Sequence, residues 1–417
     1  MLQMSEQTDS VVSVSDVEKK KWSNNVWRYG AFKFFVDFQL WLPIWVIYLN
    51  ETRGLSITEI TFLDVPFWLL LIILEVPTGI VADRWGRKVS LCYGAFINAI
   101  AVLVFGLAGN IALLFISYSV WAVAWTLFSG ADSAFVYDSL KAAGRRDEYQ
   151  KIWGRIHSIS LVAHVLGLVL GAPLAAITNL WFPIVVSAGL MLIAWIVSLT
   201  FKEPPRDEEP VSYRETILNA FNVVRSKPPV YTMMLFAGFV MAIAVSFSIL
   251  AQPYLRIHHG VDIDIIGFLQ VPGQLVGIVA ALFAYRLVGL IGVGRTMLLL
   301  PVIVLVAAIG LGSFDNIWAF AFYPLTGLVF AMSFPVLSTY FNDRIPSASR
   351  ATVLSIYQLT FSLFVALFEP VLGFLADSRG FPTAYMVAAI ILAAGTPVLY
   401  IIWRRASSKE VLLEQEV

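Results

Sequence analysis

Charged residues within long apolar stretches are the part of this sequence best suited to chemistry. Lys33 and Asp37 lie four positions apart in one such stretch, so they share one face of a helix. A carboxyl group held away from water can bind and release a proton or attract a cationic molecule. We predict that Asp37, with Lys33 beside it, does one of these. The alternative is an ion pair that only supports packing.

Three further acidic residues lie in apolar stretches. Glu369 stands next to Pro370, and we predict a second proton-binding site there. The alternative is a hydrogen bond to backbone groups that the proline frees. Asp64 either lines a vestibule or simply reaches water, and Glu75 lies one helical turn before the basic loop described below.

The elements that must hold these groups are membrane-spanning helices. Of the 417 residues, 59% are hydrophobic and only 13% are charged, whereas soluble proteins carry about 25% charged residues. Apolar runs of roughly 20 residues, enough for a helix to cross a bilayer, recur along the chain. We predict an all-α membrane protein with twelve transmembrane helices, at about 27–49, 58–81, 89–108, 112–139, 151–177, 182–200, 230–254, 264–287, 295–313, 317–340, 350–375 and 383–403.

The predicted helices form two halves of six, separated by a polar segment. That segment, 202–229, begins with a proline-rich acidic run and continues with Ile217, Phe221 and Val224 on one helical face. The pattern predicts a short amphipathic helix on the membrane surface. We expect a cytoplasmic tail at 1–26, halves at 27–201 and 230–403 joined by this cytoplasmic linker, and a second tail at 404–417.

The distribution of Lys and Arg predicts that both termini are cytoplasmic. Of the 28 basic residues, only Arg53, Arg256 and Arg379 fall in or beside the predicted outer loops, and Lys33 lies within the first span. The others lie in or next to the predicted inner segments. The short inner loops and the lack of an evident targeting signal lead us to expect a multi-pass protein of the plasma membrane.

The loop after the second predicted span carries the most specific motif. It reads Gly79-Ile-Val-Ala-Asp83-Arg84-Trp-Gly86-Arg87-Lys88. In residue types, spacing and position it resembles the signature loop of the major facilitator superfamily of transporters. The resemblance extends over the chain in the number of spans and the long middle segment. The stretch Ser129–Leu140 also resembles a fourth-span ending of bacterial exporters of this type, although Trp121 to Phe128 lacks the arginine that many of them carry there.

The resemblance implies that this loop latches the two halves together in one conformation. Asp83 would accept hydrogen bonds from the helix N-terminus near Arg350, because the helix dipole favours an anion there. Asp138 would pair with Arg84 or Arg87. The predicted latch residues are Gly79, Asp83, Arg84, Gly86, Arg87, Lys88, Asp138, Arg350 and Glu75.

The resemblance also implies a substrate cavity between the halves, walled by the first, fourth, seventh and tenth spans. These spans offer apolar and aromatic side chains with few polar groups. A sugar would need several converging polar partners, whereas such a wall suits a lipophilic or cationic organic compound. The predicted lining residues are Trp41, Trp121, Trp125, Met241, Ser246, Tyr323, Phe330 and Phe334.

Together these features predict a secondary transporter that exports lipophilic or cationic organic compounds in exchange for protons. The alternatives are a uniporter or importer of a small metabolite without proton coupling, or a non-transporting receptor on the same fold. No nucleotide-binding loop or nucleophile–base arrangement is evident, so we expect neither an enzyme nor a cofactor. The formal net charge of zero does not favour a nucleic-acid partner, and we predict no metal site. We expect a monomer whose partners are the substrate, protons and the bilayer.

Overall fold

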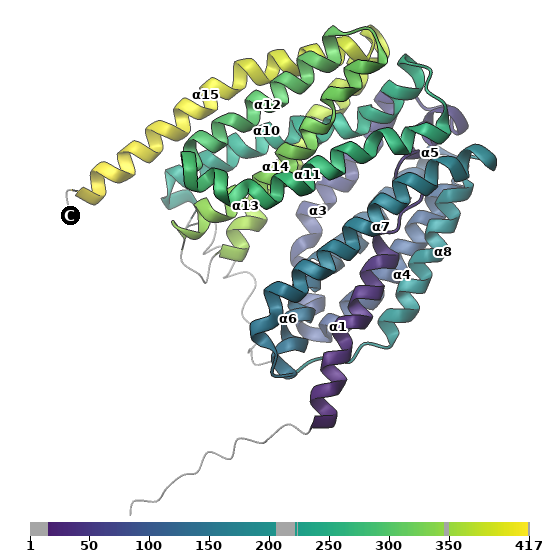
Figure 1. The fold of residues 1–417 in the computed structure, drawn as a ribbon, viewed down its shortest axis with the longest axis vertical. Helices are drawn as coiled ribbons and strands as arrows, with labels where there is room; N and C mark the ends of the chain where they lie inside the picture. Colours follow the sequence, from purple (N-terminus) through teal and green to yellow (C-terminus); the bar gives the residue numbers. More distant parts are fainter. Residues whose placement is uncertain (1–15, 206–221, 223, 346–349, 416–417) are drawn as a thin grey trace, which may run out of the picture.

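The protein is built from long helices. The computed structural model describes residues 16–205, 222, 224–345 and 350–415, and no strand occurs in these ranges (Figure 1). Side chains within a few helices, at Val76, Phe334, 350–352 and 409–415 among them, are not described.

The first half of the chain forms one group of helices. Its helices are α1 (Asp16–Asp37), α2 (Trp45–Ile47), η1 (Tyr48–Thr52), α3 (Ile57–Trp85), α4 (Arg87–Leu107), α5 (Ile111–Ser129), α6 (Asp132–Ala142), η2 (Arg146–Glu148), α7 (Tyr149–Ile177) and α8 (Phe182–Leu199).

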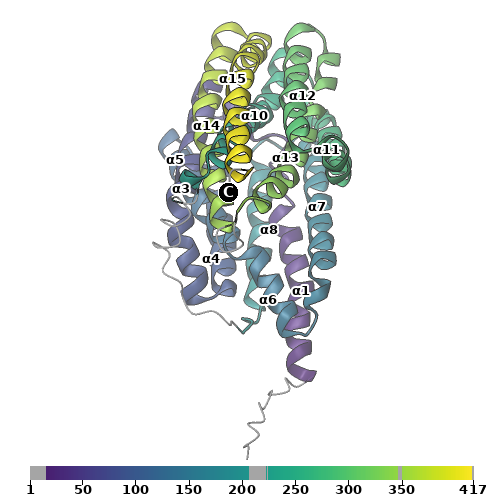
Figure 2. The same cartoon turned by 90° about the vertical axis from the view of Figure 1, so that its left-hand side faces the viewer.

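The second half forms the other group. Its helices are α10 (Pro228–Pro253), η3 (Tyr254–His258), α11 (Ile263–Ile291), α12 (Val293–Ser313), η4 (Ile317–Phe322), α13 (Pro324–Asn342), α14 (Arg350–Arg379) and α15 (Phe381–Gln415). Figure 2 shows α12 and α15 at one end of the view and α1, α4 and α6 at the other.

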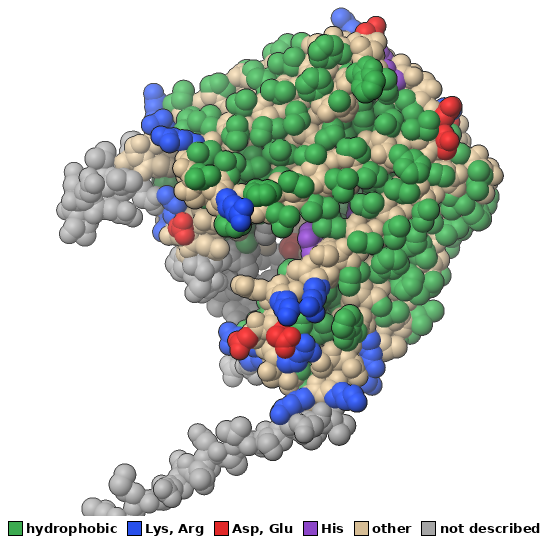
Figure 3. All heavy atoms as spheres, viewed as in Figure 1, with side chains coloured by type: hydrophobic (Ala, Val, Ile, Leu, Met, Phe, Trp, Pro, Cys, Tyr) green, Lys and Arg blue, Asp and Glu red, His purple; other side chains and the backbone are tan. Residues whose placement is uncertain are grey.

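The described helices fit a membrane protein. Eleven of them are long and apolar enough to cross a membrane, and these match the second to twelfth predicted spans. Figure 3 shows a broad hydrophobic surface over both halves, as contact with lipid requires. The prediction of an all-α membrane fold is confirmed. Of the predicted amphipathic linker helix, Ile217 and Phe221 lie outside the described residues.

The first predicted span, 27–49, is not one continuous helix. Its helix α1 ends at Asp37, residues 38–44 are not helical and include a turn at 40–44, and the helical structure resumes at Trp45. Pro43 has no backbone N–H and disfavours helix at the residue before it, which accounts for a break here. The side-chain amide of Gln39 donates a 3.2 Å hydrogen bond to the backbone carbonyl of Val36, a group left free where the helix stops.

The turn at 38–44 rests on two glycines of α7. A Cβ atom at Gly167 would lie 2.6 Å from the carbonyl oxygen of Gln39, and one at Gly171 would overlap the carbonyl oxygen of Leu40. Only a residue without a side chain allows this backbone-to-backbone approach. The Gly167–Gly171 spacing therefore positions the broken part of the first span.

The two halves diverge toward one end of the molecule. We call this the inner end, because it carries the Arg84–Lys88 loop that the charge bias predicts to be cytoplasmic; the opposite end is the outer end. Figure 1 shows α1 and α15 running apart toward the chain termini. Figure 3 shows the face between the halves hollowed there, with basic side chains on both sides of the hollow.

Contacts between the halves gather at the outer end. The Asp377 carboxylate accepts hydrogen bonds from the backbone N–H groups of Ile57 (3.1 Å) and Thr58 (2.7 Å), at the N-terminus of α3. The Arg256 guanidinium pairs with Glu51 at 2.7 Å. Several close contacts thus hold the outer end shut while the inner end is open.

Candidate functional site

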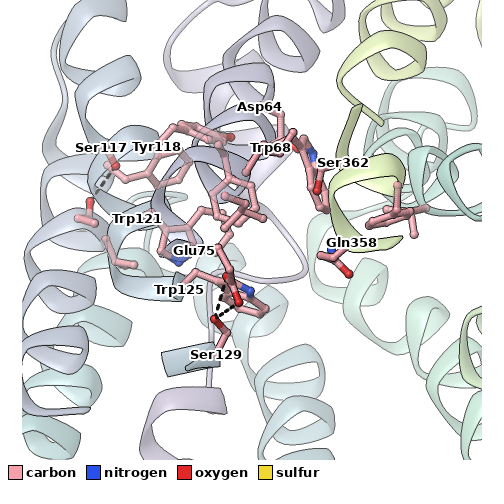
Figure 4. A pocket seen from close by; sticks show the side chains of 18 of the residues that line it. Asp64, Trp68, Glu75, Ser117, Tyr118, Trp121, Trp125, Ser129, Gln358 and Ser362 are labelled. Atoms are coloured by element: carbon pink, nitrogen blue, oxygen red, sulfur yellow. Dashed lines mark hydrogen bonds between the residues drawn. The ribbon is translucent and has the colours of Figure 1, made fainter. Parts of the chain in front are cut away.

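A cavity of about 570 Å³ lies between the two halves. Its walls come mainly from α3, α4 and α5 of the first half and α14 of the second, with Val245 of α10 and Phe330 of α13. Figure 4 shows side chains from α3, α5 and α14 facing one another across this space. The volume is within the range of small-molecule sites.

Five tryptophans and other aromatic rings form most of the wall. Trp121 of α5 stacks on Phe67 of α3 at 4.6 Å between ring centroids, and Trp41 meets the edge of Trp121 at 5.5 Å. Trp41 also contacts Trp45 at 6.3 Å and Trp121 contacts Trp125 at 6.4 Å, so ring contacts link four of the five tryptophans. The tryptophans are Trp41, Trp45, Trp68, Trp121 and Trp125.

Two carboxyl groups face the cavity and no basic side chain is among its lining residues. Glu75 of α3 accepts a hydrogen bond of 3.2 Å from the Ser129 hydroxyl, as Figure 4 shows. Asp64, nearer the outer end of α3, accepts a 2.8 Å hydrogen bond from the Trp68 indole. A cation in this cavity would meet aromatic faces and carboxylates but no positive charge.

The predicted lining residues are only partly found there. Trp41, Trp121, Trp125 and Phe330 line the cavity, and the side chain of Phe334 is not described. Met241, Ser246 and Tyr323 do not line it, which corrects the prediction. Met241 and Ser246 are buried within the second half, where α10 is covered by α14 and α15. The Ser246 hydroxyl is used internally, on the Ala242 carbonyl.

Asp64, which the sequence analysis offered as a vestibule-lining residue or one that reaches water, lines the cavity. The analysis missed the contribution of α14, the eleventh span, which supplies Gln358 and Ser362. Polar residues within apolar stretches were a visible signal, but the expected geometry directed attention to other spans.

Lys33 and Asp37 form a charged cluster in the first half. Their side chains pair at 3.0 Å, and the Ser160 hydroxyl of α7 donates to Asp37. Lys33 also lies 4.0 Å from Asp132 at the start of α6. The structure thus shows the ion pair that the sequence left as an alternative, while a transport role for Asp37 stays a prediction.

The loop after α3 has several of the features predicted for it. Gly86 adopts a φ of 118°, which an L-residue side chain disfavours, so the tight turn requires glycine. Of the two predicted partners of Asp138, Arg87 forms the ion pair. Arg87 also donates to the carbonyl of Ala134 at 2.9 Å, joining α4 to α6.

Other latch residues are placed as follows. Gly79 packs against Gly130: a Cβ atom added at Gly130 would lie 3.7 Å from the Cα atom of Gly79. The side chains of Asp83 and Arg84 are exposed, and Arg350 begins α14 but its side chain is not described. A residue that the sequence analysis missed, Glu203, accepts hydrogen bonds from the backbone N–H groups of Arg87 and Lys88 at 2.9 and 2.8 Å. It caps the N-terminus of α4, where an anion is favoured.

Glu369 is buried on α14, and its carboxyl group interacts with that of Asp64 on α3 across the interface between the halves. The sequence left open a hydrogen bond from Glu369 to a backbone group freed by Pro370, and none is found among the described residues. The sequence offered each acid separately and gave no indication of their contact.

Comparisons with known proteins agree with this architecture. The family model of the Major Facilitator Superfamily matches residues 30–262 and 234–417. An uncharacterised MFS-type transporter of Bacillus subtilis, YxaM, is 21% identical over 369 residues, covering 84% of this chain and 88% of its own. One from Burkholderia mallei is 33% identical over 81 residues, covering 19% of this chain and 20% of its own.

Two solved structures are similar in fold. The nucleoside transporter NupG superposes with a TM-score of 0.74 at 15% identity, covering 92% of this chain and 99% of that one. A bacterial homologue of the human lysosomal transporter Spinster, in an inward-facing and unoccupied conformation, gives a TM-score of 0.73 at 18% identity, with 92% and 97% covered. The family match spans nearly the whole chain, and this protein therefore belongs to the major facilitator superfamily of membrane transporters.

Proposed function

We propose that this transporter exports lipophilic or cationic organic compounds in exchange for protons. The observation that carries the proposal is the cavity, which combines five tryptophans and two carboxyl groups with no basic side chain. Aromatic faces and carboxylates attract cations, and contact with an aromatic ring adds about 0.5–2 kcal/mol per cation. A bulky lipophilic cation meets each of these features.

The open inner end supports alternating access as the mechanism. In the proposed orientation, with both termini in the cytoplasm of a plasma membrane, this state receives substrate from inside the cell. Rocking of the halves about the cavity would then close the inner end and open the outer end. Protons moving inward would supply the free energy, since export against a gradient needs a coupled energy source and the sequence has no evident nucleotide-binding loop.

A second candidate is uptake or facilitated passage of a small metabolite without protons. Gln358 and the serine hydroxyls along the cavity could orient a polar aromatic molecule stacked on tryptophan. A nucleoside is a suitable probe of that chemistry, given the similarity in fold to a nucleoside transporter.

Purified protein in liposomes tests these candidates. We would measure movement of tetraphenylphosphonium and of uridine, with and without an imposed pH gradient. Gradient-driven movement of the cation supports the proposal, whereas uridine movement that ignores the gradient supports the second candidate. The Asp37→Asn variant is assayed in parallel. Loss of gradient dependence would assign proton coupling to Asp37, and its retention would leave Asp37 as half of a structural ion pair.

A further inference from the structure

Helices α3 and α14 carry the same sequence pattern at matching positions. Aligning Ile57–Gly86 with Ala351–Gly380 requires no gap, and each aligned pair is 294 positions apart. Both segments contain Glu, three residues, Gly, two residues, Ala-Asp, two residues, Gly. Identical pairs are Thr58 and Thr352, Phe67 and Phe361, Leu69 and Leu363, Glu75 and Glu369, Gly79 and Gly373, Ala82 and Ala376, Asp83 and Asp377, and Gly86 and Gly380.

The two helices pack against each other and run in opposite directions. The end of α14 contacts the start of α3, because Asp377 caps the first N–H groups of α3. One turn earlier, a Cβ at Gly373 would overlap the hydroxyl of Thr61, so glycine permits the close approach. The pair thus has an approximate two-fold relation, in which each helix repeats the other from the opposite end.

Within this interface, the carboxyl groups of Asp64 on α3 and Glu369 on α14 lie close enough to interact. Asp64 is 8% exposed and Glu369 is 2% exposed, and one Glu369 oxygen has no hydrogen-bond partner among the described residues. Two carboxylates cannot share a hydrogen bond, because a donor proton is required and their charges repel. A buried contact between these two groups is therefore favourable only when one of them carries a proton.

The surroundings offer no positive charge in its place. The Trp68 indole donates a hydrogen bond to Asp64. The titratable side chain that faces the pair from α5 is Tyr118. Of the remaining packed helices, α10 and α13 contain no acidic, basic or histidine residue, and the charged residues of α4 and α15 lie only toward their inner ends. On η1, which packs against α3, Tyr48 is bonded to Arg53 and Glu51 to Arg256. No ion pair involving either carboxyl is found in the described ranges.

We propose that Asp64 and Glu369 form a proton-binding site that joins the two halves and exists only while the outer end is closed. This inference rests on the proposed function and names the site of its coupling ion. When the outer end opens, α3 and α14 separate there and both carboxyls reach outer water, where they ionise. Binding a proton from outside allows the two groups to meet again, so the outer end closes.

Release to the inner side follows from the position of Asp64. Asp64 lines the cavity that is open toward the inner end, whereas Glu369 is buried behind it. A proton can leave through Asp64 into that cavity. The two carboxylates left behind repel each other and favour opening of the outer end, which returns the protein to the state that binds the next proton.

The repeat explains why closure of the outer end takes up a proton and closure of the inner end does not. The position equivalent to Asp64 on α14 is Gln358, and the equivalent of Glu369 on α3 is Glu75. Both line the open cavity, and Figure 4 shows them on its two sides. When the inner end closes by the same movement, Glu75 meets an amide. An amide donates to a carboxylate without any added proton, so only closure of the outer end consumes one.

Distance measurements between the outer ends test the site. Spin labels are placed at Gly109→Cys and Asp315→Cys in a Cys92→Ser background, in protein reconstituted in nanodiscs; both positions are exposed. The wild-type pair should shift from the longer to the shorter distance as the pH falls. Asp64→Asn and Glu369→Gln replace the shared proton with an amide donor, so each should show the short distance at every pH.

Two further variants make the result decisive. Asp264→Asn, an exposed acid on α11, should retain the wild-type pH response. The double exchange Asp64→Glu with Glu369→Asp keeps the carboxyl pair and should also retain it, even if the single variants fold poorly. A wild-type pH response in correctly folded Asp64→Asn and Glu369→Gln, or its loss in the double exchange, would overturn the proposal.

Transport separates this inference from the function on which it rests. If wild-type protein drives tetraphenylphosphonium with a pH gradient and the single variants do so equally well, the site is wrong and the function stands. If wild-type protein shows no gradient-driven transport but the variants abolish the pH response of the distance, the site stands and the proposed export fails.

Discussion

Glu75 projects into the cavity from α3, one helical turn before Gly79, and is held there by the Ser129 hydroxyl. Replacing it with Gln keeps the size and the hydrogen bond but removes the negative charge. We expect the Glu75→Gln variant to bind tetraphenylphosphonium about ten-fold more weakly, a loss of about 1.4 kcal/mol. Binding measured by isothermal titration on detergent-solubilised protein gives this number.

The Ser129→Ala variant is the matched control, since it leaves the carboxylate in place and should change affinity far less. An uncharged aromatic ligand should bind Glu75→Gln as it binds the wild type. Equal loss for charged and neutral ligands would show that the substitution disturbs the cavity rather than its charge.

At this scale the sequence identified residues more readily than contacts. The ion pair of Lys33 with Asp37 followed from helical spacing, and the pairing of Asp138 with Arg87 was one of two predicted alternatives. Asp64 and Glu369 lie on different halves, so no local spacing relates them. Comparing the second span with the eleventh in search of a repeat would have aligned Glu75 with Glu369 and shown Gln358 opposite Asp64.

Among the elements, α7 depends on a glycine to seat the broken first span. A Cβ at Gly171 would overlap the carbonyl oxygen of Leu40, and backbone cannot swing aside as a flexible side chain can. Gly171→Ala should therefore destabilise the protein by about 1–3 kcal/mol. A lower midpoint of thermal unfolding, followed by loss of the monodisperse fraction on heating, would show it.

Gly189→Ala on α8 provides the comparison, because a Cβ there meets nothing within 4 Å. Alanine in a helix is favoured over glycine by roughly 1 kcal/mol, so this variant should be unchanged or more stable. If the Gly171 and Gly189 variants unfold at the same temperature, the first span does not need its glycine seat.

The cap at the outer end of α3 is the second element with a measurable effect. Asp377→Ala removes three hydrogen bonds from the N-terminus of α3, two from backbone N–H groups and one from the Thr58 hydroxyl, a loss of about 1–2 kcal/mol that favours the outward-open state. Labelling of Ser117→Cys in the cavity by an outer, membrane-impermeant maleimide, in a Cys92→Ser background, should accelerate about five-fold or more. Ser378→Ala, one residue away, should label at the wild-type rate.

Element boundaries show where local sequence rules were sufficient. Apolar length predicted the second to twelfth spans, since a bilayer imposes the same requirement on each. The first span broke at 38–44 because Pro43 and the seat on α7 act together, and the second of these is a contact between distant segments. A proline alone was no sufficient signal, because α3 contains Pro66 and Pro77 and continues through both.

Over the whole molecule, the sequence predicted two halves but not their relative position. That position depends on a balance of contacts at the two ends, each of which exists in one state and not in the other. In this structure the outer end holds the Asp377 cap and the Arg256–Glu51 pair, while the latch loop at the inner end binds within its own half through Asp138.

Locking the outer end shut tests whether the halves must move for transport. Glu51 and Arg256 pair at 2.7 Å across the halves, so cysteines at both positions lie within reach of a flexible bis-methanethiosulfonate linker in a Cys92→Ser background. Cross-linking should abolish transport of tetraphenylphosphonium, while binding from the inner side continues because the cavity remains open there. Reduction of the linker should restore transport, and each single-cysteine variant should be unaffected by the reagent. Continued transport by fully cross-linked protein would mean that substrate crosses without separation of α3 from α14, and the rocking of the halves about this cavity would have to be abandoned.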